Sequence, residues 1–183
     1  MGGSVPGEWI SKVLKFWFGL DFAQWWKTDP ALDERIKHSF LKLWAEKRQL
    51  PSDAFLTDPL TALAGVILFD QLPRNMFRGH ADQFATDHLA LAIAKAAIDR
   101  GFDEELQPQE RGFLYMPFQH SENLADQNRS LLLFMELGDK VQLGYAKKHH
   151  DIIERFGRFP HRNPILGRVP RPDETAAGDV VPW

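Results

Sequence analysis

Histidines and arginines concentrate between Ala146 and Arg168, in AKKHHDIIERFGRFPHRNPILGR. The segment up to Gly157 has helical spacing, and residues three and four apart on a helix share a face. His149 therefore falls on the apolar stripe of Val141, Tyr145, Ile152 and Phe156. An inward histidine beside a carboxylate can act as a general acid or base. The same placement is also typical of a neutral core histidine that bridges two helices.

The second half of this segment is cationic. Eight Lys or Arg stand against two acidic residues between Lys140 and Pro172. Arg155, Arg158 and Arg162, with His161 and Asn163, could hold a phosphate or carboxylate through bidentate contacts. A solvated charged face with ion pairs to acids elsewhere is the alternative interpretation.

Further polar residues occur in FDQLPRNMFRG, from Phe69 to Gly79. Asp70 falls on the apolar face of the helix predicted before it, so it should be inward or half-buried, and a buried carboxylate needs a cation or several donors. Arg74 is near in sequence, and Arg155 or Arg162 could reach it in space. We therefore expect Asp70, Arg74 and Asn75 to contribute to the same polar centre.

A third motif, FLYMPFQHSENLADQ, spans Phe113 to Gln127. His120 titrates near neutrality when its environment does not perturb it. Ser121 or Asn123 could cap the next helix, and no nucleophile-elbow context surrounds Ser121. The candidate catalytic residues are accordingly His120, Glu122, His149 and His150.

A metal site is not predicted. His149 and His150 are adjacent, so their side chains diverge by about 100° on a helix. His150 and Glu154 have chelating spacing, but neither an H-E-x-x-H motif nor a Glu-x-x-His pair occurs. Further ligands would have to come from His120, Glu122 or Asp70. No cofactor is expected either.

The elements that must position these residues are helices. No segment alternates like a strand, and no glycine-rich phosphate loop occurs. We predict an all-α array of seven or eight antiparallel helices. Five of the predicted helices are Glu8–Phe18, Pro30–Gln49, Leu60–Asp70, Gln83–Arg100 and Pro108–Tyr115. A further helix should end near Leu137 and bury Leu124, Leu131, Leu132 and Met135. The last should end at Gly157. Trp25 and Trp26 are placed in a connection, Pro117 should break the chain, and the turn from Arg158 to Pro164 should not be helical.

Composition narrows the class of protein. The 183 residues carry a net charge of −3, which argues against a dedicated nucleic-acid binder. The absence of cysteine excludes thiol catalysis and cysteine zinc sites. The longest apolar run is about half the ~20 residues that a bilayer requires, and the start lacks a secretory layout. We expect a cytoplasmic protein without membrane association.

The three motifs together resemble a bacterial family, domain of unknown function 924, in the same order and across about Val13 to Arg168. The resemblance implies an all-helical fold similar to tetratricopeptide repeats, and no established activity. After Gly167 the sequence RVPRPDETAAGDVVPW departs from the family pattern. We therefore expect one helical domain over residues 1–168 and a mobile tail over 169–183.

Two functions fit these features. The first is a binding module, with a protein or peptide partner or a small anionic ligand held by the His/Arg/Asp centre. The alternative is a small hydrolase or transferase that uses His120 or His149 as acid or base.

Overall fold

A computed structural model describes residues 7–183, which form helices and turns with no strand in that span. The all-α prediction is confirmed, and seven of the α-helices in this span have eight residues or more. The structure divides into two compact units, an N-terminal unit that ends at Leu114 and a C-terminal unit from Tyr115 to Trp183. The single helical domain expected over residues 1–168 stays a prediction, because chain length alone limits the size of a core but does not fix how it is divided.

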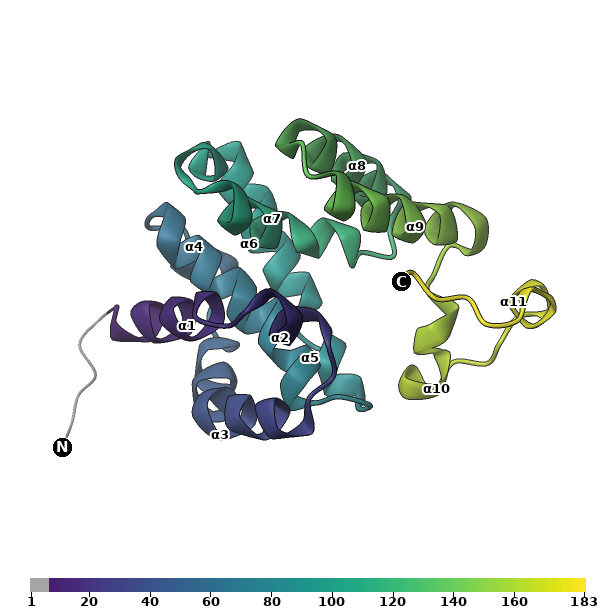
Figure 1. Cartoon of the computed structure of the whole chain (residues 1–183), viewed down its shortest axis with the longest axis horizontal. Helices are drawn as coiled ribbons and strands as arrows, with labels where there is room; N and C mark the ends of the chain where they lie inside the picture. Colours follow the sequence, from purple (N-terminus) through teal and green to yellow (C-terminus); the bar gives the residue numbers. More distant parts are fainter. Residues whose placement is uncertain (1–6) are drawn as a thin grey trace. The chain divides into compact units, whose positions relative to one another are not determined.

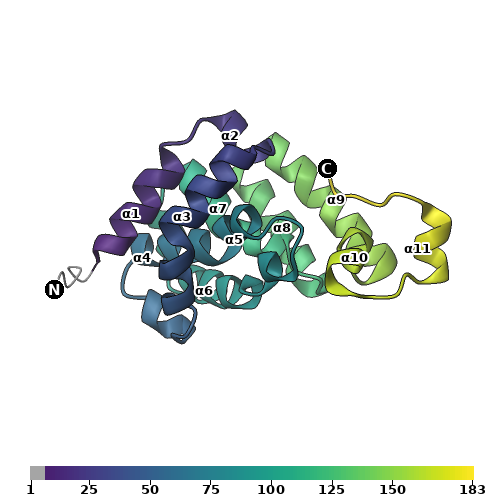
Figure 2. The same ribbon diagram turned by 90° about the horizontal axis from the view of Figure 1, so that it is seen from below.

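From residue 7 onward the N-terminal unit contains six α-helices and part of a seventh, and Figures 1 and 2 label them. Their bounds are α1 Glu8–Phe18, α2 Phe22–Trp26, α3 Pro30–Lys47, α4 Pro59–Val66, α5 Leu72–Met76, α6 Asp87–Asp99 and α7 Pro108–Gln119. Single turns of 3-10 helix cover Ser52–Phe55, Ala81–Phe84 and Phe102–Glu105. The predicted helix over Gln83–Arg100 thus begins at Asp87.

The starts of α3 and α4 follow the sequence signals. Asp29 accepts a hydrogen bond from the amide of Ala31 (3.0 Å), and Asp58 accepts one from the amide of Thr61 (2.9 Å). Each cap is followed by proline at the first helical position, where no amide donor is needed. Beyond its first turn the helix after Asp58 is buried, since Thr61 to Val66 are all buried, whereas Leu60 is exposed.

Large aromatic side chains are buried in the N-terminal unit, and the ring of Phe55 lies against Gly65 of α4. Trp17, Phe40, Phe55 and Phe69 are all buried, and the Phe55 and Phe69 rings meet edge to face at 5.2 Å. Such pairs stabilise a core beyond the area that they bury. The connection predicted at Trp25 contains α2 instead, because Asp21 and Gln24 form a capping box that supports one short helix.

A π-helical turn, Ile67–Gln71, joins α4 to α5. Pro73 lies at the start of α5 and has no amide hydrogen to donate to the preceding turn. The carbonyl of Phe69 instead accepts a hydrogen bond from the hydroxyl of Thr86 (2.7 Å), and that hydroxyl accepts one from the indole of Trp44 (3.1 Å). A side chain from elsewhere in the unit thus completes the irregular turn.

Helix α7 continues through Pro117 to Gln119, although the sequence predicted its end at Tyr115. A proline is costly in the middle of a helix because it removes a hydrogen bond and clashes with the preceding turn. Pro117 lies in the last turn of α7, so only two further residues have to follow it.

The C-terminal unit contains α8 (Leu124–Leu137) and α9 (Lys140–Phe156), which pack together as an antiparallel hairpin (Figure 1). Gly138 closes α8 with φ of 78°, and the side chain of Asp139 caps α9. Beyond α9 come a 3-10 turn (Pro160–Arg162), α10 (Asn163–Leu166) and α11 (Pro172–Ala177). The sequence analysis expected a turn rather than a regular helix over 158–164. Arg158 and Phe159 do lie outside any helix, but a 3-10 turn and the start of α10 follow them, because both prolines lie at helix starts, where they are tolerated.

The apolar stripes predicted for α8 and α9 are only partly correct. Ile152 and Phe156 are buried with Ile153 and Phe159, whereas Val141 is 60% exposed. On α8 and α9, further residues predicted to be buried are exposed: Leu124, Leu132, Met135 and Tyr145. Helical spacing identifies a shared face, but it does not show which part of that face a neighbour covers.

The last fifteen residues contain α11 and contact the rest of the C-terminal unit, and the mobility expected for this tail stays a prediction. Glu174 in α11 is only 3% exposed, and Ala177 and Val180 pack against the buried cluster at the end of α9. These contacts favour an anchored ending. No helix within residues 7–183 combines the length and apolar character needed to cross a bilayer. The first six residues, including those used for the secretory-signal prediction, lie outside this span.

Candidate functional site

The carboxylate of Glu122 anchors the turn that follows α9. It accepts two hydrogen bonds from the guanidinium of Arg168 (2.8 and 3.0 Å) and one from the amide of Phe159 (2.9 Å). Burial alone would raise the pKa of Glu122, but the Arg168 and Phe159 hydrogen bonds and the charge of Arg162 hold this pKa below its usual value. Glu122 is therefore an anion that fixes backbone geometry.

A second carboxylate, Glu174, is held in the same way. It accepts hydrogen bonds from Arg158 Nε and Nη2 (2.7 and 2.9 Å) and from the Asn163 amide (3.0 Å). The Arg158 contact is the main reason that the pKa of Glu174 falls to about 2, against the opposing effect of burial. Asn163 also accepts a hydrogen bond from Arg168 Nε (3.0 Å), which links the two carboxylates. These residues, Glu122, Arg168, Asn163, Glu174 and Arg158, form what we call the ion-pair network.

In this network Arg158 and Asn163 both donate hydrogen bonds to Glu174, a partner that the sequence did not indicate. Both were candidate ligand-binding residues, and both contact Glu174. Arg168 and Glu174 were not among the candidate site residues. A sequence signal for Glu174 exists, since Pro172 at a helix start with an acidic residue in the first turn is typical of a helix N-terminus.

Three histidines gather around the ring of Phe159 in the same unit. The ring centroids of His120 and His149 are 6.1 Å apart, those of His149 and Phe159 5.5 Å, and those of Phe159 and His161 5.7 Å. We call His120, His149 and His161 the histidine cluster. The predicted inward position of His149 holds in part, because its side chain is half-buried.

The ring of His149 has a defined hydrogen position. Its Nδ1 lies 2.7 Å from the carbonyl oxygen of Tyr145, which can only accept, so Nδ1 carries the hydrogen and donates it. In the neutral ring Nε2 then keeps its lone pair. Burial is the main cause that lowers the pKa of His149 to about 3, and the charges of His120, Arg162 and His161 lower it further, against the opposing Tyr145 hydrogen bond.

Arg162 lies at the centre of this cluster. Its side chain is buried, Nη2 donates to the carbonyl oxygen of His120 (3.0 Å), and the guanidinium carbon lies 4.6 Å from the ring centre of Phe159. His161 contacts the ring of Trp183 at 5.0 Å, so the end of the chain also meets the cluster. Arg155, by contrast, is exposed on α9 and lies over the Phe156 ring.

The candidate residues near the π-helical turn belong to the N-terminal unit. Asp70 is fully buried, as predicted, and Arg74 lies 3.6 Å from its carboxylate. The closer partner of Arg74 is Asp87, which receives two hydrogen bonds (2.8 and 3.0 Å). Burial opposes the charged form of Arg74, but Asp87 and Asp70 raise its pKa. Asn75 donates to Asp33 (2.9 Å).

The remaining polar residues of the third motif have structural contacts. Ser121 donates to Asp126 (2.7 Å), and Asn123 caps α8 through the amide of Ala125 (2.9 Å). The predicted centre is therefore divided between the units, with Asp70, Arg74 and Asn75 in one and the histidine cluster with Arg162 in the other.

These features define an all-helical protein whose C-terminal unit carries a histidine cluster supported by buried ion pairs. The chain belongs to the family of bacterial proteins of unknown function called DUF924, whose model matches residues 13–177. This match includes α11, so the family pattern extends beyond Gly167, where the sequence analysis placed a departure.

A solved structure of a protein of unknown function from Agrobacterium tumefaciens is similar to this chain. The two share 39% sequence identity and superpose with a TM-score of 0.84, over 92% of this chain and 95% of the other. A comparison with curated proteins finds no match. The similarity to tetratricopeptide repeats stays a prediction.

Proposed function

We propose that the C-terminal unit binds a small anionic ligand at the histidine cluster and Arg162. The observation that carries this proposal is the buried guanidinium of Arg162, which donates to the carbonyl oxygen of His120 and lies against the ring of Phe159, where the rings of His149 and His161 also meet. Burial is the main cause of the lowered pKa of His149, and the charges of its neighbours lower that pKa further. A positive potential at a half-buried ring opposes its protonation. The same potential attracts an anion.

The ligand class follows from the donors. Arginine binds phosphate and carboxylate groups through charge-assisted hydrogen bonds. In the neutral form, Nε2 of His149 accepts a hydrogen bond, so it is complementary to a hydroxyl or a protonated oxygen on the ligand. Hydrogen phosphate and hydroxy acids combine both features.

The lowered pKa of His149 favours a role in ligand binding over a role as a general base. A general base works best when its pKa lies near the working pH, and a pKa of about 3 lies far below neutrality. His149 would be a weak base, whereas its fixed ring suits recognition. The ion-pair network supports this role, because Glu122 holds the amide of Phe159, whose ring contacts His149.

The test is an NMR titration of the histidine ring signals of the full chain with inorganic phosphate and, separately, citrate. We expect saturable shifts of the signals of His120, His149 and His161, with a rise in the pKa of His149 because a bound anion favours its charged form. His38 and His88 are exposed in the N-terminal unit and serve as internal controls. If the cluster signals move no more than these controls, the proposal is wrong.

Two variants strengthen the assignment. Arg162→Lys keeps the charge and removes the planar donor set, so the affinity for phosphate should fall at least about tenfold. Since Arg162 is buried, the half-buried His161→Gln variant provides a second test with less risk to folding. A variant that folds and binds phosphate unchanged would exclude that residue from the site.

A protein partner is the second candidate, and exposed apolar side chains favour it. Leu132 and Met135 near the end of α8 and Val141 and Tyr145 near the start of α9 are all exposed. Apolar surfaces of helical arrays commonly receive partner segments. A photo-crosslinker placed at Glu136, exposed between them, should capture one discrete partner in cells, and Leu132→Lys should abolish the adduct.

A further inference from the structure

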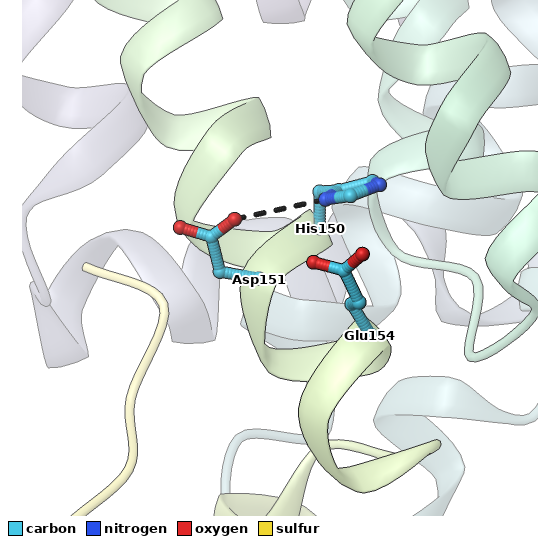
Figure 3. Close-up of side chains that lie close together, drawn as sticks. All are labelled: His150, Asp151 and Glu154. Atoms are coloured by element: carbon cyan, nitrogen blue, oxygen red, sulfur yellow. Dashed lines mark ion pairs between the residues drawn. The ribbon is translucent and has the colours of Figure 1, made fainter.

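Three potential metal ligands lie together on one turn of α9, outside the histidine cluster. The nearest ligand atoms of His150, Asp151 and Glu154 all lie within 4.8 Å of one another. Figure 3 shows an oxygen of Asp151 facing one nitrogen of the His150 ring, with the carboxylate of Glu154 nearby. Asp151 and Glu154 are exposed, whereas the side chain of His150 is only 14% exposed, so its orientation is restricted.

The ring of His150 is oriented by a residue of α8. Its Nε2 lies 2.8 Å from the side-chain oxygen of Asn128, which can only accept, so Nε2 carries a hydrogen. In the neutral ring Nδ1 therefore has a lone pair, and this atom lies 3.6 Å from a carboxylate oxygen of Asp151. The repulsion between this lone pair and the carboxylate is removed by a proton on Nδ1 or by a metal ion that both atoms bind.

We propose that Nδ1 of His150 and the carboxylates of Asp151 and Glu154 bind a divalent transition metal ion, with Zn²⁺ as the best match. Zinc takes imidazole nitrogen at about 2.0–2.1 Å and carboxylate oxygen at about 2.0–2.2 Å in tetrahedral geometry, which places donor atoms about 3.4 Å apart. The His150 to Asp151 separation is already close to this value. Rotation of the exposed Glu154 side chain completes the set, and water takes the fourth position.

Asn128 supplies the outer contact that such sites use. Metal-binding histidines usually donate their other ring hydrogen to an oxygen, which fixes the ring and increases its basicity. The contact was not predictable from spacing, because Asn128 lies twenty-two positions before His150. The sequence analysis noted the chelating spacing of His150 and Glu154 but looked for the further ligands in other motifs, whereas the structure brings the neighbouring Asp151 to the same place.

Nearby cations oppose the binding of a divalent ion. Lys147 and Arg155 are exposed on the same helix. We therefore expect a single site of modest affinity. The proposal does not depend on the anion site, since none of its ligands belongs to the histidine cluster.

The experiment is calorimetric titration of the full chain with ZnCl₂ at neutral pH in a buffer that does not bind metal. One saturable site is expected. Asp151→Asn, Glu154→Gln and His150→Gln should each weaken binding at least about tenfold. Asn128→Ala should weaken it by about 10–100-fold with all three ligands intact, which identifies Asn128 as a positioning residue.

The matched control is Glu34→Gln on α3. Glu34 and His38 are also four residues apart on an exposed helix face, so a change there should leave the zinc affinity unaltered. Histidine ring signals give a second readout, since Zn²⁺ should shift the signals of His150 and not those of His38. Absence of saturable binding, or equal affinity in Glu154→Gln and the unmodified chain, would overturn the proposal. Phosphate binding by the histidine cluster would be unaffected by either result.

Discussion

The two units are stabilised in different ways. In the N-terminal unit a nearly all-apolar helix, α4, lies among aromatic side chains. In the C-terminal unit the buried cluster at the end of α9 has four residues, and guanidinium–carboxylate contacts connect the turns around it. Charge-assisted hydrogen bonds are directional, so they can hold irregular turns in one geometry where apolar contact alone could not. The comparison predicts that the units respond differently to loss of apolar area and to loss of charge.

The largest effect is expected from Phe69→Ala in the N-terminal unit. The ring is fully buried against Phe55, and removal of a buried aromatic side chain costs about 3–5 kcal/mol because it leaves a cavity. Denaturant unfolding measures this loss, with the exposed Phe22→Ala as control, for which we expect less than about 0.5 kcal/mol. A loss below about 1 kcal/mol for Phe69→Ala would contradict the assigned apolar core.

Removal of residues 169–183 should have the next largest effect. It deletes Glu174 from the ion-pair network and Val180 from the buried cluster. We expect the melting temperature to fall by about 10 °C. Hydrogen exchange should show the loss of protection in α9 and α10 and little change in α4. An unchanged melting temperature would support the prediction that residues 169–183 form a mobile tail.

Glu122→Gln tests the network at its other carboxylate. The variant keeps the shape of the side chain but removes the charge that receives Arg168 and the Phe159 amide. Hydrogen bonds to charged groups contribute about 1.5–3 kcal/mol, so we expect a loss of about 2 kcal/mol. The control is Glu136→Gln, at an exposed position of α8. Equal stability of the two variants would show that the network contributes little.

Acidification should destabilise the C-terminal unit in two stages. The pKa of His149 is lowered to about 3 in the folded state, so between about pH 6.5 and 3 only the unfolded chain binds this proton, and stability falls as pH falls. The pKa values of Glu122 and Glu174 are also lowered, so their contribution is present above about pH 4.5 and is lost as pH falls through the folded values.

The first stage is the smallest effect. From pH 6.5 to 4.5 we expect a loss of about 1–2 kcal/mol, and His149→Gln should remove most of this pH dependence. Unfolding at a series of pH values measures it, with exposed His38→Gln as control. If the slope is the same in both variants, His149 is not the group responsible.

Local signals in the sequence predicted the local features well. Aspartate before proline gave the starts of α3 and α4, and an almost wholly apolar run gave the buried helix. The burial of Asp70 followed from its place on an apolar face. Each of these depends on residues within one or two turns of each other.

The features that the sequence did not predict depend on contacts between residues that are distant in the chain. The partner of Arg158 is Glu174, sixteen positions later and in a segment whose composition indicated mobility. Val141 and Phe156 share one apolar stripe of α9, yet Val141 is exposed and Phe156 is buried. Phe156 is covered because the chain after α9 packs against it through residues such as Phe159. His149 and His150 are adjacent, yet different neighbours decide what each can bind.

The π-helical turn between α4 and α5 rotates α5 about the helix axis relative to α4. An α-helix advances by about 100° per residue, so the residue accommodated in Ile67–Gln71 rotates everything after it by about that angle. Deleting one residue from this turn would remove the extra residue and rotate α5 back relative to α4. It would also turn Arg74 away from Asp87 and move the Phe69 carbonyl from the hydroxyl of Thr86. One residue of chain length thus sets the angular register of α5.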